Sequence, residues 1–181
     1  MRRWLSVMSV AVSILALPAV ARAQAKAGDK EIQIFGNVIT IITPSTRIGN
    51  VTFGGTSATG NLFINAGVFV SDNTEVGGGP SITISSDDPI FDTGVSVFLR
   101  NFFGDQSAKI KPYVSVDYFI QSFNTSGNQS IADNQFLNVG GGIRDYLNEK
   151  TALDISVKYG FNPKNSDLKL IIANIGITFV F

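Results

Sequence analysis

The chain has 181 residues, with 14 basic and 14 acidic side chains and neither cysteine nor histidine. The missing cysteine excludes disulfides and thiolate metal sites, and the missing histidine excludes a Ser-His-Asp triad and most imidazole metal sites. The charge balance argues against a nucleic-acid partner, because neutralising phosphates requires clustered Lys and Arg.

The first 23 residues have the pattern of a secretory signal peptide. The cationic start Met1-Arg2-Arg3 precedes a mostly apolar run over 4–20, and Ala21-Arg22-Ala23 places small residues where a signal peptidase cleaves. A membrane-spanning anchor is the alternative, but the run is interrupted by serines and is short for a span. We therefore predict a signal peptide over 1–23 and one domain over 24–181, with 11 basic and 14 acidic residues.

The predicted domain consists of segments in which apolar and polar residues alternate, the period of a β-strand with two different faces. In the seventh segment, for example, Leu153, Ile155 and Val157 alternate with Asp154 and Ser156. Eight such segments follow one another, at 31–41, 60–70, 75–84, 93–102, 110–123, 135–147, 151–161 and 168–181. An even number of strands returns both chain ends to one side, as single-chain bacterial barrels require.

The connections between these segments differ in length in a regular way. Three are short, at 71–74, 103–109 and 148–150, and the other four are mostly longer and rich in Ser, Thr, Asn, Asp and Gly: 42–59, 85–92, 124–134 and 162–167. Short turns on one side and long loops on the other are typical of an outer-membrane barrel. The sequence thus predicts an all-β, eight-stranded antiparallel up-and-down transmembrane barrel, with both termini in the periplasm.

A soluble, lipocalin-like barrel is the alternative, because it has the same period with the apolar faces turned inward. Two features favour the membrane. The polar faces consist mainly of Gly, Ser, Asn and isolated charges, which suit a narrow lumen, and aromatic residues such as Tyr159, Phe161, Phe179 and Phe181 lie near strand ends. No apolar run of about 20 residues follows the signal, so insertion has to use strands.

Several charged residues fall on the inward faces, where an unpaired charge is costly. A three-residue turn at 148–150 pairs Leu147 with Thr151, sets Arg144 opposite Asp154 and predicts a salt bridge between them, with Lys158 and Asp117 nearby. The predicted cluster comprises Glu75, Arg100, Asp117, Arg144, Asp154 and Lys158. We interpret it as a polar plug, because inward phenylalanines further obstruct an eight-stranded lumen. A proton path or an ion-selective constriction is the alternative.

Few other residues suggest chemistry. Asp87, Asp88 and Asp92 share one segment that offers oxygen ligands for calcium, but their spacing lacks a regular calcium-loop pattern, and a solvated acidic loop is the favoured interpretation. The triple glycines at 77–79 and 140–142 lie inside strands, where they permit close approach and bending. We expect no catalytic residue, no metal site and no cofactor.

Two segments carry a resemblance to known proteins. The hairpin over Gly142–Leu153 and the closing strand Gly176-Ile177-Thr178-Phe179-Val180-Phe181 resemble those of the OmpX-like and opacity-protein-like outer-membrane barrels of Gram-negative bacteria. The resemblance implies that Phe181, Phe179 and Ile177 form a C-terminal signal read by the barrel assembly machinery. It also implies periplasmic chaperones as partners during biogenesis and outer-membrane lipid as the surroundings.

The resemblance leaves the function open between two classes. The first is a structural or surface-interaction protein, adhesion-like, that meets an extracellular ligand through four exposed loops while side chains fill its lumen. The second is a narrow, porin-like channel or carrier for small or apolar solutes. Neither class involves an enzymatic step.

Overall fold

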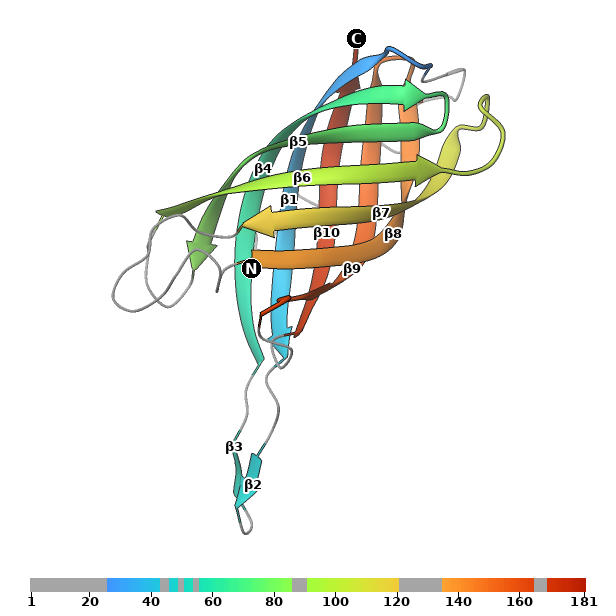
Figure 1. Cartoon of the computed structure of the whole chain (residues 1–181). Helices are drawn as coiled ribbons and strands as arrows, with labels where there is room; N and C mark the ends of the chain where they lie inside the picture. Colours follow the sequence, from blue (N-terminus) through green and yellow to red (C-terminus); the bar gives the residue numbers. More distant parts are fainter. Residues whose placement is uncertain are drawn as a thin grey trace, which may run out of the picture.

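The computed structural model describes residues 26–42, 46–48, 51–53, 56–85, 91–120, 135–164 and 169–181, so the predicted signal peptide lies outside the described residues and stays a prediction. Eight strands form a closed barrel in which sequential neighbours pair antiparallel, and the first strand also pairs with the last (Figure 1). No helix in the described part is long and apolar enough to cross a membrane. The predicted eight-stranded antiparallel barrel is confirmed.

The barrel strands lie close to the predicted segments. They are β1 (Lys30–Ile42), β4 (Thr56–Ser71), β5 (Thr74–Ser85), β6 (Phe91–Phe102), β7 (Ile110–Ile120), β8 (Gln135–Asn148), β9 (Thr151–Phe161) and β10 (Lys169–Val180). The fifth predicted segment ran to residue 123, and its last three residues fall outside the described residues.

The segment between β1 and β4 corrects one expectation. Residues 42–59 were expected to form an irregular loop, but they contain a short hairpin of β2 (Thr46–Ile48) and β3 (Val51–Phe53). Gly-Asn between two β-prone runs is a hairpin signal, which the composition-based interpretation overlooked. The hairpin extends from the end of the barrel opposite the C-terminus (Figure 1).

The turn between β8 and β9 is shorter than predicted. Asn148 pairs with Thr151, so the turn contains only Glu149 and Lys150, and the predicted pairing of Leu147 with Thr151 is wrong. The register then shifts between Tyr146 and Asn148, where a bulge adds the residue that the shorter turn lacks. Beyond the bulge Arg144 lies opposite Asp154, as predicted, because the extra residue in the bulge offsets the residue missing from the turn.

The outer surface of the barrel is apolar on every strand. Large apolar side chains such as Val38, Val97, Val157 and Ile175 are more than half exposed. A soluble barrel would bury this face, since a continuous apolar belt is stable only against another apolar phase. The arrangement contradicts the lipocalin-like alternative and fits strands that cross a membrane.

The interior is layered. An apolar cluster of Phe35, Ile39, Phe63, Phe119, Phe136, Leu170 and Ile172 lies towards the loop end. Two smaller clusters lie towards the turn end, one of Tyr146, Ala152 and Val180 and one of Phe69, Phe102 and Tyr113. Buried polar and charged side chains occupy the lumen between these clusters, and they form the candidate site.

Candidate functional site in the barrel lumen

Strand parity places charged side chains in the lumen. The six residues predicted from the sequence all lie on inward faces, where five are buried and the side chain of Lys158 is 10% exposed. The prediction missed Glu31 and Lys111, which are 1% and 2% exposed. The alternation of the strands could have identified both residues. Glu31 lies on the same face of β1 as Gln33, and Lys111 lies on the same face of β7 as Tyr113.

Arg144 is the centre of what we call the central ion-pair cluster: Glu31, Glu75, Arg100, Arg144 and Asp154. Its Nε lies 3.0 and 3.1 Å from the two carboxylate oxygens of Asp154. Its Nη1 lies 2.8 Å from both oxygens of Glu31, and its Nη2 lies 3.3 Å from Oε2 of Glu75. One guanidinium thus joins carboxylates of β9, β1 and β5, using the fork of donors that makes arginine suited to such contacts.

Other polar groups complete the hydrogen bonding of the cluster. Thr178 donates to Oδ2 of Asp154 at 2.6 Å, and Gln33 donates to carboxylate oxygens of Glu31 and Glu75. Nη1 of Arg100 lies 3.5 Å from Oε2 of Glu75. Each carboxylate therefore has at least two donors, which is the condition under which buried ion pairs become tolerable.

Aromatic rings and a glycine surround these charges. The guanidinium of Arg144 lies 4.7 Å from the ring centroid of Phe102, and that of Arg100 lies 4.3 Å from the centroid of Phe98, both within cation–π range. At Gly67, a Cβ atom would collide with Oε1 of Glu75, so the missing side chain leaves room for this carboxylate. The cluster thereby crosses the lumen from β9 to β5.

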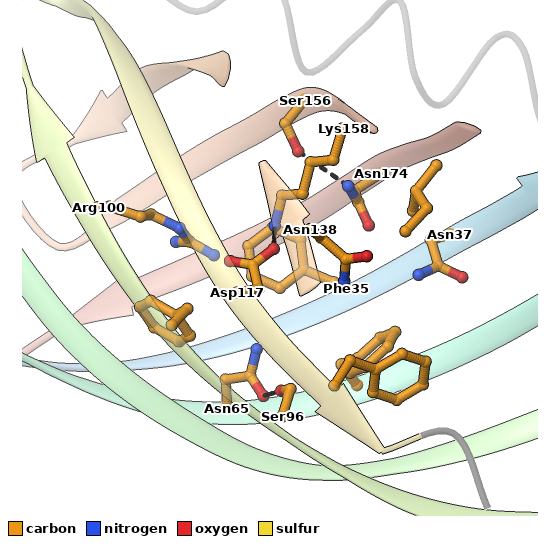
Figure 2. Close-up of a pocket in the computed structure, with 14 residues that line it drawn as sticks. Phe35, Asn37, Asn65, Ser96, Arg100, Asp117, Asn138, Ser156, Lys158 and Asn174 are labelled. Atoms are coloured by element: carbon orange, nitrogen blue, oxygen red, sulfur yellow. Dashed lines mark hydrogen bonds and ion pairs between the residues drawn. The ribbon is translucent and has the colours of Figure 1, made fainter. Parts of the chain in front are cut away.

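A second group of polar residues lies between the cluster and the loop-end apolar layer. Here Lys158 pairs with Asp117, and within the described residues no ion pair joins either of them to the predicted neighbouring pair of Arg144 and Asp154. These side chains border a space that we call the chamber (Figure 2). Its cavity volume is about 40 Å³. Its lining comprises Phe35, Asn37, Phe63, Asn65, Ser96, Phe98, Arg100, Asp117, Phe119, Asn138, Ser156, Lys158, Ile172 and Asn174.

Pairing is less complete in the chamber than in the cluster. Ser96 donates to Oδ1 of Asn65 at 3.2 Å, and Asn174 donates to Oγ of Ser156 at 3.0 Å. Other buried polar atoms of the lining have no hydrogen-bond partner in the described part of the chain: Nε of Arg100, Oδ1 of Asp117 and Oδ1 of Asn138. The chamber therefore offers open hydrogen-bonding positions, whereas the cluster has its carboxylates engaged.

Side chains of the short turns form hydrogen bonds with neighbouring segments at the turn end of the barrel. Asp72 accepts a hydrogen bond from the backbone N–H of Ala27 at 3.1 Å, and its contact with Gln106 joins a second turn. These hydrogen bonds, that to Gln106 foremost, hold the pKa of Asp72 below its usual value. Asp105 accepts from the N–H and hydroxyl of Ser107, which lowers its pKa too.

The remaining candidates have simpler surroundings. Ile177, Phe179 and Phe181 are exposed on the outer face, and the N–H of Phe181 donates to the carbonyl of Lys30 at 2.8 Å, so the last residue belongs to the β1–β10 seam. Their role as an assembly signal stays a prediction. Asp87 and Asp88, and the side chain of Asp92, lie outside the described residues, and the described part contains no group of acidic residues placed to hold a metal.

The fold matches solved structures of small outer-membrane barrels. The N-terminal β-barrel domain of Pseudomonas aeruginosa OprF is 17% identical, with a TM-score of 0.57 over 86% of this chain and 98% of that one. Neisserial surface protein A is 14% identical (TM-score 0.54, 83% and 97%), and Ail, the attachment invasion locus protein of Yersinia pestis, is 17% identical (TM-score 0.50, 86% and 99%). No protein-family profile and no curated protein matches the sequence.

Proposed function

We infer that this chain, an eight-stranded closed β-barrel with an apolar outer face, is a non-conducting protein of the bacterial outer membrane with a structural or surface-interaction role. The central ion-pair cluster carries this proposal. Arg144 contacts carboxylates from three other strands across the lumen, and every charged side chain of the cluster is at most 3% exposed. Passage of a hydrated solute would require these pairs to separate in a medium where unpaired charges are costly.

The end of the barrel that carries the long connections supports the proposed surface-interaction role. The connections there are mostly longer and polar, and the β2–β3 hairpin extends beyond the barrel wall (Figure 1). Such segments carry recognition in proteins whose scaffold is rigid. One solved protein of this fold, Ail, bears the name of an attachment invasion locus protein, so the architecture is compatible with such a role.

Single-channel recording tests the closed lumen. We expect pure protein, folded in lipid and verified by a heat-dependent gel mobility shift, to give no discrete openings in a planar bilayer. Reproducible openings from the unaltered protein would overturn the proposal and favour the channel or carrier alternative. The double variant Glu31→Gln with Glu75→Gln, which removes two of the carboxylates around Arg144, serves as a comparison for leakage caused by a loosened cluster.

Loop replacement tests the interaction role. Exchanging residues 43–55 for a short Asn-Gly turn leaves every residue of the central ion-pair cluster in place. We expect the variant to show the same mobility shift but to lose adhesion of expressing bacteria to the cell or matrix surface that the unaltered protein binds. A matched exchange of the turn-end segment 104–108 should leave adhesion intact. Equal adhesion after removal of the long loops, singly and together, would contradict the surface-interaction role.

A further inference from the structure

The β1–β10 seam, where the barrel closes, differs from the other borders between its strands. Each other pair of neighbouring barrel strands is joined directly by one connection of the chain, whereas β1 and β10 are the first and the last strand. Their ladder extends from Glu31 opposite Val180 to Ile42 opposite Lys169. Bringing together two strands so far apart in sequence has a high entropic cost, and no turn holds them side by side. Whatever keeps this seam closed must therefore come from non-covalent contacts.

Side chains of the central ion-pair cluster connect the two strands of this seam through the lumen. On the β10 side, Thr178 donates to Asp154 at 2.6 Å, and Asp154 accepts from Nε of Arg144 at 3.0 Å. On the β1 side, Nη1 of the same guanidinium donates to both oxygens of Glu31 at 2.8 Å. A path of charge-assisted hydrogen bonds thus leads from β10 through β9 and β8 to β1, in addition to the backbone ladder.

The path lies at the turn end of the seam. Glu31 is opposite Val180, and Gln33 is opposite Thr178, in the last turns of the ladder before the end of β10. The side chains of Glu31 and Arg144 are both 0% exposed. Opening of the seam at this end would separate them and leave two buried charges without each other, which is costly away from water.

The order in which these contacts can form gives Glu31 a role of its own. Arg144 and Asp154 are 10 residues apart and face each other across a two-residue turn, so they can pair within one hairpin. Glu31 is 113 residues from Arg144, and contacts of such separation form late because loop-closure entropy opposes them. We propose that the Glu31–Arg144 pair is a closure latch: it forms as β1 meets β10, and its separation limits the rate at which the seam reopens.

The folding and unfolding rates of Glu31→Gln test the latch. The variant keeps the size of the side chain but removes its charge, so we expect unfolding in urea to be about tenfold faster. Folding into micelles should change by less than about twofold, because a contact that forms late acts mainly on the unfolding rate. The heat-dependent gel mobility shift follows both reactions. Glu149→Gln, in an exposed turn, is the matched control and should change neither rate.

A disulfide across the seam tests where the latch acts. The chain has no cysteine, so an introduced pair can form only its own bridge. Ile34→Cys with Ile177→Cys joins opposite, outward positions of β1 and β10. Leu99→Cys with Val116→Cys does the same for β6 and β7 and is the matched control. After oxidation, the first bridge should reduce the effect of Glu31→Gln on the unfolding rate to less than about twofold, and the second should leave it at about tenfold.

The two bridges also test the proposal with Glu31 in place, which matters if Glu31→Gln does not fold. The β1–β10 bridge should then slow unfolding several-fold more than the β6–β7 bridge, because opening begins at the seam that the latch holds. The proposal is overturned if Glu31→Gln slows folding as much as it speeds unfolding, or leaves the unfolding rate unchanged. It is also overturned if the β1–β10 bridge does not diminish the effect of Glu31→Gln, or if the two bridges slow unfolding equally.

Discussion

The central ion-pair cluster and the chamber are neighbours in one lumen, and they differ in how completely their carboxylates are paired. In the cluster, Arg144 reaches three carboxylates and each carboxylate has a further donor. In the chamber, Asp117 has one ion-pair partner, Lys158, and its Oδ1 stays open, as do Oδ1 of Asn138 and Nε of Arg100, a residue that both regions share. Carboxylates that are all engaged suit a rigid crossing of the lumen, whereas a carboxylate with an open oxygen beside a cavity suits hydration.

The largest effect should follow from removing the centre of the cluster. Arg144→Met leaves three carboxylates without their shared partner and should lower the free energy of unfolding by about 3–5 kcal/mol. Urea titration of the micelle-folded protein measures the loss. Lys109→Met is the matched control: it removes an ion pair of 3.5 Å whose lysine is 38% exposed, and such pairs contribute about 0–1 kcal/mol. Equal losses in the two variants would contradict the importance of the cluster.

Lys158→Met removes the cation that pairs with Asp117 in the chamber, and its effect can be compared with that of Arg144→Met. Its removal leaves one carboxylate that can still be hydrated in the adjacent space, so we expect a loss of about 1–2 kcal/mol in the free energy of unfolding, clearly below that of Arg144→Met. The same urea titration measures it. Were the loss as large as for Arg144, the two regions would not differ in pairing as described.

The room that Gly67 provides should have a similar, moderate effect. Gly67→Ala places a Cβ against Oε1 of Glu75 and should cost about 1–3 kcal/mol, because Arg144, Arg100 and Gln33 restrain that carboxylate. Gly36→Ala is the control in an outward position with nothing within 4 Å, and it should change stability by less than about 0.5 kcal/mol. Comparable losses for both glycines would indicate a backbone effect instead of the close contact.

The smallest effect should come from the turn end. Asp72→Asn should slightly lower stability at neutral pH, because the folded state holds the pKa of Asp72 below its usual 3.8. A depressed folded pKa stabilises above the unfolded pKa, and that stabilisation disappears as pH falls through the folded pKa. The difference between the variant and the unaltered protein, measured by urea titration, should therefore shrink below about pH 4. A difference that grows on acidification would contradict the assignment.

Much of the barrel was predictable because alternation is a local property. Each residue of β9 reveals its face through its two neighbours, and the same holds for the closing strand. The pairing of Arg144 with Asp154 followed from counting across one turn, and it survived an error in the turn because a bulge compensated. The β2–β3 hairpin was missed since its signal, two residues between short runs, is easily taken for loop composition.

The partners of Arg144 beyond Asp154 were not predictable in the same way. Glu31 is 113 residues away in sequence, and Glu75 is 69 residues away. Their approach depends on strand tilt and on the stagger between strands, which are properties of the closed barrel as a whole. Parity alone places such side chains in the lumen, but it does not determine the height at which each one lies. For the same reason, parity could not predict that Lys158 and Asp117 pair with each other and not with Arg144 or Asp154.

The central claim is that Arg144 holds carboxylates from distant strands together across the lumen. A double-mutant cycle between Arg144→Met and Glu31→Gln, measured by urea unfolding in micelles, tests it most directly. We predict a coupling energy above about 1 kcal/mol, because the two side chains share two hydrogen bonds of 2.8 Å. Additivity of the two variants within about 0.5 kcal/mol would contradict the claim.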